Sequence, residues 1–444
     1  MDKTYDLLVV GAGASGLAAA VEASRAGASV LVLEKNHVPG RKVLSTGAGK
    51  CNFSNLKVTP ARFHPPSSAF LKKAFAALPP AEVPAFFAGL GLLYADAGDG
   101  RLFPRSQKAQ DVVSALANEL GARGAELRTL TEVRALRRAG DFFEAEAAAV
   151  LPKWDKRPAP EGRQVFRGRR ALLAAGGPCY PQIGGTSAGA ALLRELGHTV
   201  SELAPVLVPL KVGEDLVKEL DGVRAQAALT LLAGGKAAAS SEGELLFTAY
   251  GLSGPAALDL SRAALDALRR GEARVLADLF PDIPAPKFRR LLEARAAAFS
   301  ARPFHHFCCG LANEKVCKAA ARLAGINMAM SAGLVGKEQL AAFGGALKAM
   351  TFGLTGTLGF EDAMVTAGGC SLAEIDPETF ASKKVPGLFV TGELLDLDGD
   401  SGGFNLHLAW TSGILAGRAA ASYARAAGKE KGRFRGPFHS GDRG

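Results

Sequence analysis

The sequence has few of the features that mark secreted, membrane-spanning or zinc-binding proteins. Its 444 residues include only six cysteines, and no two of them form a Cys-x-x-Cys pair, so neither a zinc site nor a disulfide framework is favoured. No apolar run approaches the ~18 residues that a membrane-spanning helix needs. A basic segment followed by a cleavable apolar stretch, the mark of a signal peptide, is also missing before the first expected strand. We therefore expect a cytoplasmic protein with reduced thiols and no membrane span.

Aromatic residues are scarce, and acidic residues are outnumbered by basic ones. Aromatic side chains make up 7% of the chain, and the formal net charge is +10. Such a charge can indicate nucleic-acid binding, but the basic residues are spread thinly, and no stripe of basic and aromatic residues or recognised RNA module is visible. A nucleic-acid partner is therefore not the favoured interpretation. The length predicts two or three domains, because one hydrophobic core rarely serves so long a chain.

A strand, a glycine loop, a helix and a second strand are predicted over residues 6–34. The apolar run that ends at Val10 leads into Gly11-Ala12-Gly13-Ala14-Ser15-Gly16, and the second apolar run ends at Glu34. This order is the dinucleotide-binding fingerprint of an α/β protein, in which the helix N-terminus carries free N–H groups and a partial positive charge that suit a diphosphate.

Each part of that fingerprint has a physical role. Gly11 permits the tight turn, Gly13 lets a pyrophosphate approach the backbone, and Gly16 lets the helix pack close to the sheet. Glu34 can accept hydrogen bonds from the adenosine ribose, and an acid there disfavours a 2′-phosphate. The segment therefore predicts FAD or NAD rather than NADP.

A second loop, Lys35 to Asn52, is rich in glycine and basic residues. Gly47 and Gly49 permit close backbone approach. Three basic side chains can neutralise a diphosphate or the flavin end of a cofactor: Arg41, Lys42 and Lys50. Cys51 fits either a redox thiol or a small packed residue, and the second is favoured because no other cysteine is near it in the sequence.

Changes in the hydrophobic pattern and glycine content along the chain predict an interrupted α/β domain. Residues 1–204 are expected to form its first part, 205–350 an inserted domain of antiparallel strands plus helices, 351–428 its second part, and 429–444 a basic, flexible tail. Within the first part, strands near 125–130 and 133–137 are expected to extend a mostly parallel sheet, with Val133 offering its backbone to an adenine. Helices are expected in the insert at 255–270, 287–300 and 314–323.

The carboxyl ends of two later strands are candidate ligand sites. The run 171–177 ends in glycines and is followed by Tyr180, which either faces the ligand or is a rigid turn residue. The run 385–393 ends at Glu393, and open α/β sheets bind ligands at this end of their strands. A long helix is then predicted from Gly402-Gly403 to about residue 426, with its positive N-terminus facing the ligand.

Two groups of residues superficially resemble metal sites. His305, His306, Cys308 and Cys309 cannot easily converge on one ion. Asp396, Asp398 and Asp400 lack the twelfth-position Glu of a calcium loop, since His407 stands there. No metal is therefore expected.

The segments 6–55, 171–187, 243–255 and 351–417 together resemble the bacterial flavoprotein family that includes the BaiN-like NAD(P)/FAD-dependent oxidoreductases and aminoacetone oxidase. The resemblance covers nearly the whole chain and implies an α/β fold, a Rossmann-like FAD-binding domain interrupted by the inserted domain. It implies FAD contacts at Gly11, Gly13, Ser15, Gly16, Glu34, Lys35, Arg41, Lys42, Gly47, Cys51, Asn52, Val133, Ala175, Gly176, Glu393, Asp398 and Asn405. Their neighbours are included in the predicted cofactor site: Ala14, Ala48, Gly49, Gly392, Gly403, Phe404 and Leu406.

Two positions depart from the pattern of that family. Lys50 stands where the family commonly has Arg, which keeps the charge but loses the flat fork of the guanidinium. His407 stands where it commonly has Gln, beside the expected flavin ring. His407 is therefore a candidate general acid or base, or a simple hydrogen-bond donor, and Tyr180 is a second candidate catalytic residue.

The favoured function is an FAD-dependent oxidoreductase that transfers a hydride between a small organic substrate and flavin N5. Only one dinucleotide fingerprint is present, so NAD(P)H is expected, if at all, as a transient donor. The alternatives are a nucleic-acid-modifying flavoprotein and a flavin-bound sensor without turnover. The sequence predicts neither the substrate nor the oligomeric state.

Overall fold

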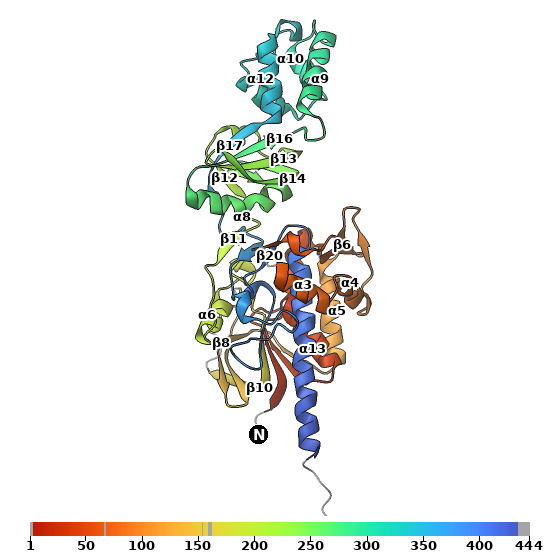
Figure 1. Ribbon diagram of the computed structural model, residues 1–444, viewed down its shortest axis with the longest axis vertical. Coiled ribbons are helices and arrows are strands. Elements are labelled where there is room, and N and C mark those ends of the chain that lie inside the picture. Colours follow the sequence, from red (N-terminus) through yellow and green to blue (C-terminus); the bar gives the residue numbers. More distant parts are fainter. Residues whose placement is uncertain (1–2, 66–67, 153, 159–161, 434–444) are drawn as a thin grey trace, which may run out of the picture. The chain divides into compact units, whose positions relative to one another are not determined.

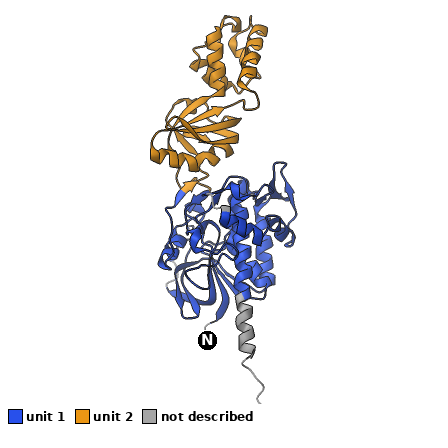
Figure 2. Cartoon of the chain, in the orientation of Figure 1, with its two compact units in different colours: residues 1–204, 365–444 blue, residues 205–364 orange. Residues whose placement is uncertain are grey.

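The computed structural model describes residues 3–65, 68–152, 154–158 and 162–433, with side chains to residue 422 apart from that of Ser68. The chain forms two compact units, residues 1–204 with 365–444 (unit 1) and residues 205–364 (unit 2), which are coloured separately in Figure 2. Each unit has its own hydrophobic core.

Unit 1 is built on one mixed sheet, of which β8 and β10 are labelled in Figure 1. Its strand order is β7–β2–β1–β10–β9–β8, and β19 also pairs with β10. Its strands are β1 (Thr4–Val10), β2 (Val30–Leu33), β7 (Glu126–Arg128), β8 (Thr131–Ala139), β9 (Phe142–Ala149), β10 (Arg163–Leu173) and β19 (Leu388–Val390). The pairs joining β7, β2, β1, β10 and β19 are parallel. The expected Rossmann-like, mostly parallel sheet is therefore confirmed.

One expectation about this sheet is wrong. The strand predicted at 133–137 does not extend the parallel part, because β8 pairs antiparallel with β9, and β9 pairs antiparallel with the first half of β10. The short connection between β8 and β9 makes them a hairpin, which only antiparallel strands can form.

Helix α1 lies against the long C-terminal helix α13 with unusually close backbones. A Cβ added at Gly413 or Gly417 of α13 would lie 2.3 Å from the carbonyl oxygen of Ser15 or Ala19. The helices of unit 1 are α1 (Ala14–Arg25), α2 (Arg41–Ser45), α3 (Ser68–Ala77), α4 (Glu82–Ala88), α5 (Ala109–Ala122), α6 (Ala188–Glu195) and α13 (Phe404–Arg433). This packing fixes the N-terminus of α13 relative to the glycine loop.

Short elements surround these helices and the sheet. The strands are β3 (Ser54–Asn55), β4 (Phe63–His64), β5 (Tyr94–Asp96), β6 (Arg101–Pro104), β18 (Val365–Ala367) and β20 (Asp398–Gly399), and β11 (Ala204–Val206) lies at the boundary of the units. The 3₁₀ helices are η1 (Thr46–Gly49), η2 (Pro60–Arg62), η3 (Pro181–Ile183), η5 (Leu372–Glu374) and η6 (Gly392–Leu394).

Unit 2 contains a closed barrel of antiparallel strands in the order β12–β15–β14–β13–β16–β17. The strands are β12 (Leu210–Val212), β13 (Arg224–Ala233), β14 (Lys236–Thr248), β15 (Gly251–Ser253), β16 (Ala273–Asp278) and β17 (Met350–Thr357). The helices are α7 (Leu216–Glu219), α8 (Pro255–Arg270), α9 (Ala285–Ala298), α10 (Phe304–Cys308), α11 (Glu314–Leu323) and α12 (Lys337–Lys348), with η4 (Ala332–Leu334). The inserted domain of antiparallel strands plus helices is thus confirmed as a class.

The limits of the units differ in part from those expected. The first boundary falls between Ala204 and Pro205, but the second falls after Met364 rather than after residue 350. The reason is β17, which pairs with β12 and β16 and completes the barrel. The expected tail, 429–444, also begins too early, because α13 continues to Arg433; residues 434–444 lie outside the described residues.

Candidate flavin site

The three glycines of the loop between β1 and α1 differ in their backbone conformation and in the space around them. Gly11 has a φ of +102°, and a Cβ there would lie 2.5 Å from the Ala174 carbonyl oxygen. A Cβ at Gly16 would lie 2.0 Å from the Gly11 carbonyl oxygen. Gly13 differs, because its φ of −79° suits any residue and its nearest neighbour would be 3.9 Å away. The fold itself explains Gly11 and Gly16, whereas open space above Gly13 leaves room for a ligand.

Glu34 ties the glycine loop to the end of β2. Its carboxylate is almost fully buried and accepts a hydrogen bond from the Ala12 amide at 2.7 Å. The other oxygen accepts from the backbone N–H and the side-chain amide of Asn36, each at 2.7 Å. A carboxylate has about four acceptor positions, so a ribose hydroxyl can still be bound.

The second loop is anchored on the first. The Gly40 amide donates to the Ala12 carbonyl oxygen at 2.7 Å, which sets α2 beside the glycine loop. Lys42 on α2 then reaches Glu393, with its Nζ 2.8 and 3.0 Å from the two carboxylate oxygens. Glu393 also accepts from the Thr366 amide at 2.8 Å. Two residues 351 positions apart are thus joined by one ion pair at the carboxyl edge of the sheet.

Residues 47–51 form a turn with repeated positive φ angles. Gly47, Ala48, Gly49 and Cys51 all have φ between +54° and +82°, and the first three are exposed. Burial raises the pKa of the Cys51 thiol to about 11, which keeps it protonated at neutral pH. This geometry favours the packed interpretation of Cys51 over the redox thiol.

The N-terminus of α13 lies against the same loop. A Cβ at Gly403 would lie 2.7 Å from the Ser54 carbonyl oxygen and 2.8 Å from Asn52 Oδ1. A Cβ at Gly392, before α13, would lie 2.6 Å from Ser15 Oγ at the start of α1. The start of α1, the carboxyl end of β19 and the start of α13 therefore converge, and the neighbouring residues Ala14, Phe404 and Leu406 lie on the first turns of these helices.

Asn405 and Asp398 belong to the structure around the start of α13. The Asn405 amide accepts from the Gly399 N–H at 2.8 Å and donates to the Gly399 carbonyl oxygen at 2.7 Å. Asp398 is buried and opens β20. Both residues shape the segment before α13, whatever they contribute to a ligand.

His407 is completely buried within the first turns of α13. Its Nδ1 lies 2.9 Å from Ser54 Oγ, while its Nε2 has no hydrogen-bond partner among the described residues. Burial lowers the pKa of His407 to about 4, so the ring is neutral at neutral pH. In this state it can accept or donate a hydrogen bond but carries no surplus proton.

The remaining predicted residues lie on β8, after β2, after β10, on α2 and at η3. Val133 lies on β8 next to a bulge, and two residues earlier the Thr131 amide donates to the Glu34 carbonyl oxygen at 2.8 Å. Burial lowers the pKa of Lys35 nearby.

Ala175 and Gly176 follow β10, and a Cβ at Gly176 would lie 3.9 Å from Glu393. Arg41 donates to Asn36 Oδ1 at 3.2 Å. Tyr180, with φ of +56°, caps η3.

These residues fit an FAD molecule. The open space at Gly13 would admit a diphosphate, Glu34 and Val133 would face the adenosine, and Lys42 lies at the sheet edge beside Glu393. Asn52 Oδ1 and His407 Nε2 are buried polar atoms without a protein partner, as expected of atoms that meet a ligand. Sequence reasoning missed Asn36, Ser54 and Asn55, whose side chains join these loops; Asn55 donates to the Gly402 carbonyl oxygen at 2.8 Å.

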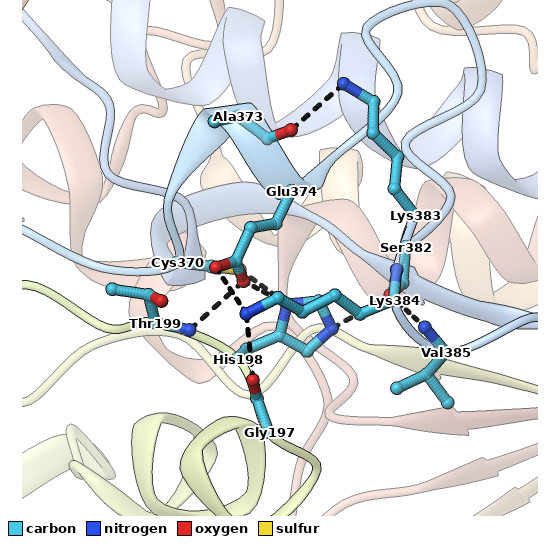
Figure 3. A network of polar contacts seen from close by, with 10 residues as sticks. All are labelled: Gly197, His198, Thr199, Cys370, Ala373, Glu374, Ser382, Lys383, Lys384 and Val385. Atoms are coloured by element: carbon cyan, nitrogen blue, oxygen red, sulfur yellow. Dashed lines mark hydrogen bonds and ion pairs between the residues drawn. The ribbon is translucent and has the colours of Figure 1, made fainter.

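A different cluster in unit 1 looks like a metal site but is fully hydrogen-bonded (Figure 3). His198, Cys370 and Glu374 place their ligand atoms within 4.8 Å of one another. Yet His198 Nδ1 lies 2.8 Å from Glu374, Lys384 lies 2.6 Å from the same carboxylate, and Ser382 Oγ lies 2.9 Å from His198 Nε2. The candidate ligand atoms are therefore already engaged with one another and with Lys384 and Ser382, and the cluster joins three loops.

Comparison with known proteins agrees with the geometry of the site. A family model described as "HI0933-like protein Rossmann domain" matches residues 5–419. The chain belongs to the HI0933-like family. The resemblance to this class of bacterial flavoproteins is thereby confirmed, and the chain is an FAD-dependent oxidoreductase.

Two relatives and one solved structure illustrate what this chain is similar to. The 3-dehydro-bile acid delta(4,6)-reductase of Clostridium scindens is 33% identical, covering 93% of this chain and 98% of the relative. The ribosomal RNA dihydrouridine synthase of Escherichia coli is 28% identical, covering 92% and 96%. The 3-ketosteroid delta1-dehydrogenase structure from Sterolibacterium denitrificans, at 14% identity and a TM-score of 0.51, covers 95% of this chain and 100% of its own, and shows the fold alone.

Among the described residues, no helix has both the length and the apolar character that crossing a bilayer requires.

Proposed function

We propose that the protein transfers a hydride between flavin N5 and a small organic substrate, in the direction of substrate reduction. The observation that carries the proposal is the convergence of three distant segments on one edge of the sheet. Lys42 pairs with Glu393 at 2.8 Å, and Gly392 lies directly against Ser15. A dinucleotide lying on α1 would reach this edge with its flavin end.

The cofactor contacts follow from the predicted site. The amides at the start of α1 would bind the diphosphate, Glu34 the ribose, and Val133 the adenine. Lys42, Asn52 and the first turn of α13 would surround the flavin. When bound, FAD supplies hydride transfer, and the protein supplies position, charge and a proton.

The start of α13 would tune the cofactor. A helix N-terminus favours a nearby anion by up to ~2 kcal/mol when partly buried. If it stabilises the reduced anionic flavin by that amount, the two-electron potential rises by roughly 40 mV. His407, neutral and hydrogen-bonded to Ser54, would act here as a hydrogen-bond partner of the ring.

The substrate class is inferred from the relative with the highest identity given above. That relative is named a delta(4,6)-reductase of a 3-dehydro-bile acid, and the match covers 93% of this chain and 98% of the relative. We therefore propose a small molecule with a carbon–carbon double bond activated by a carbonyl group, with NAD(P)H as the transient electron donor.

An anaerobic half-reaction experiment tests this function. Purified protein is reduced with NADH or NADPH while flavin absorbance is followed, and 2-cyclohexenone is then added as a simple unsaturated ketone. Bleaching by a nicotinamide and recovery on adding the ketone, with formation of the saturated ketone, is the expected result. Flavin that bleaches with dithionite but is reoxidised by oxygen alone would contradict the substrate class.

A second function has a specific observation in its favour. Residues 285–348, which hold α9 to α12, contain ten Lys and Arg against three Glu, so most of the net charge of +10 lies there. Two relatives, at 28% and 27% identity, are named ribosomal RNA dihydrouridine synthase. An RNA-modifying flavoprotein would use such a basic surface to bind phosphates.

The two functions are distinguished by how RNA binding and ketone reduction depend on salt concentration. Binding of ribosomal RNA fragments should weaken by roughly 10³–10⁵ between 50 and 200 mM salt if six to ten phosphates are contacted. Reduction of 2-cyclohexenone should change little over that range. Salt-insensitive or undetectable RNA binding would leave the small-molecule function as the account of this chain.

A further inference from the structure

A half-exposed histidine is held by a carboxylate close to the start of α13. The two-residue strands β4 and β20 pair antiparallel, with His64 opposite Asp398. His64 Nε2 lies 3.0 Å from Asp400 Oδ1, and the His64 side chain is 41% exposed. The strand pairing thus brings an imidazole to the segment that leads into α13.

Arg62 completes this cluster. Its Nε lies 3.2 Å from Asp400 Oδ2, and its guanidinium lies 4.6 Å from the centre of the Phe404 ring, the first residue of α13. The Asp400 amide donates to the Arg62 carbonyl oxygen at 3.0 Å, and Asn405 donates to the Asp400 carbonyl oxygen at 3.3 Å. The Asp400 carboxylate therefore lies between the Arg62 guanidinium and the His64 imidazole, with one oxygen facing each.

The other described histidines of unit 1 are poorly suited to give a proton to a substrate. His407 is fully buried, and its neutral ring has no contact with solvent. His198 is buried between Glu374 and Ser382. His37 packs against Trp154, with ring centroids 4.5 Å apart, three residues after Glu34 on the adenosine side. His64 alone among them combines exposure, a carboxylate partner and proximity to α13.

We propose that His64 is the proton donor to the substrate and that Asp400 is its positioning residue, an inference that rests on the proposed reduction of a double bond. Such a reduction forms two C–H bonds and breaks one C–C π bond. The hydride goes to one carbon and leaves the flavin oxidised. The proton goes to the other carbon from the imidazolium of His64, which becomes neutral and is protonated again from solvent.

The test uses the holoenzyme and compares His64→Gln, Asp400→Asn and the control His306→Gln, an exposed histidine of unit 2. Flavin reduction by NAD(P)H and reoxidation by 2-cyclohexenone are measured separately by stopped-flow absorbance. We expect His64→Gln to slow the reoxidation step by roughly 10²–10⁴-fold, the usual contribution of a general acid, while flavin content and the reduction step stay unchanged. The control should match the wild type in both steps.

A second readout does not depend on turnover. NMR titration of the histidine side chains should show that the pKa of His64 falls in Asp400→Asn, because the anionic partner is lost while Arg62, which also faces Asp400, remains. An unchanged pKa of His64, or a His64→Gln enzyme that reoxidises within threefold of the wild type, would overturn the proposal. Absence of ketone reduction in the wild type would reject the proposed substrate class, and the titration would still decide whether Asp400 controls His64.

Discussion

The three glycines of the first loop should respond differently to the same substitution. Gly11→Ala would place a Cβ 2.5 Å from the Ala174 carbonyl oxygen in a left-handed conformation. The conformation costs roughly 1–2 kcal/mol and the overpacking about 1–3 kcal/mol. A loss of ~2–5 kcal/mol is a large part of the 5–15 kcal/mol that typically stabilises a domain.

Gly13→Ala meets neither penalty, because φ is −79° and the nearest protein atom would be 3.9 Å away. The unfolding free energy of its apoprotein should therefore stay within about 1 kcal/mol of the wild type. FAD affinity should fall, because the methyl group occupies the space of the diphosphate. Loss of one charge-assisted hydrogen bond, worth about 1.5–3 kcal/mol, weakens binding roughly 10–150-fold. Gly13→Asp should abolish binding, since it adds repulsion.

The assay combines urea unfolding of the apoproteins with FAD titration followed by flavin fluorescence. Gly121→Ala in α5 is the matched control, because nothing lies within 4 Å of its added Cβ. It should change neither FAD affinity nor the fold. Wild-type FAD affinity in Gly13→Ala would refute the assignment of this loop to the diphosphate.

Three further predictions follow from side chains around the site. A double-mutant cycle of Lys42→Gln and Glu393→Gln, measured by urea unfolding, should give a coupling of roughly 0.5–3 kcal/mol, and additive effects would mean that the pair does not join the loops. The pKa of His407 is about 4 in the fold and ~6.5 when unfolded, so its contribution is present above pH ~6.5 and lost as pH falls toward 4. Between pH 7 and 4.5, the free energy of unfolding should therefore decrease by on the order of 2–3 kcal/mol less in His407→Gln than in the wild type. Equal decreases would show that the ring is not desolvated. Iodoacetamide should modify exposed Cys309 in the native protein and spare Cys51, whose pKa of about 11 keeps it a thiol, as peptide mass mapping can show; early labelling of Cys51 would restore the redox-thiol interpretation.

Local signals in the sequence were sufficient for the first βαβ segment and for several helices. The glycine spacing around Gly13 predicts a turn and a helix start from neighbouring residues alone. The helices α8 and α11 run over Pro255–Arg270 and Glu314–Leu323, as predicted, because Pro255 opens one and Asn313 caps the other. These features depend on contacts within one turn of the chain.

The features that were missed depend on pairing between distant residues. The segment Met350–Thr357 contains two glycines and reads like a loop of the α/β domain, yet pairing with β12 and β16 makes it a barrel strand. The sequence pattern does not predict helices α10 and α12 either. Arg62, His64 and Asp400 meet only through two-residue strands, and 336 positions separate His64 from Asp400, so no sequence period indicates them.

A crystal structure of the FAD complex would test the central claim most directly. The account predicts the diphosphate within hydrogen-bonding distance of the amides at the start of α1, and the isoalloxazine ring between Lys42 and the first turn of α13. A diphosphate bound away from Gly13, or a flavin ring remote from Gly403 and Asn405, would contradict it.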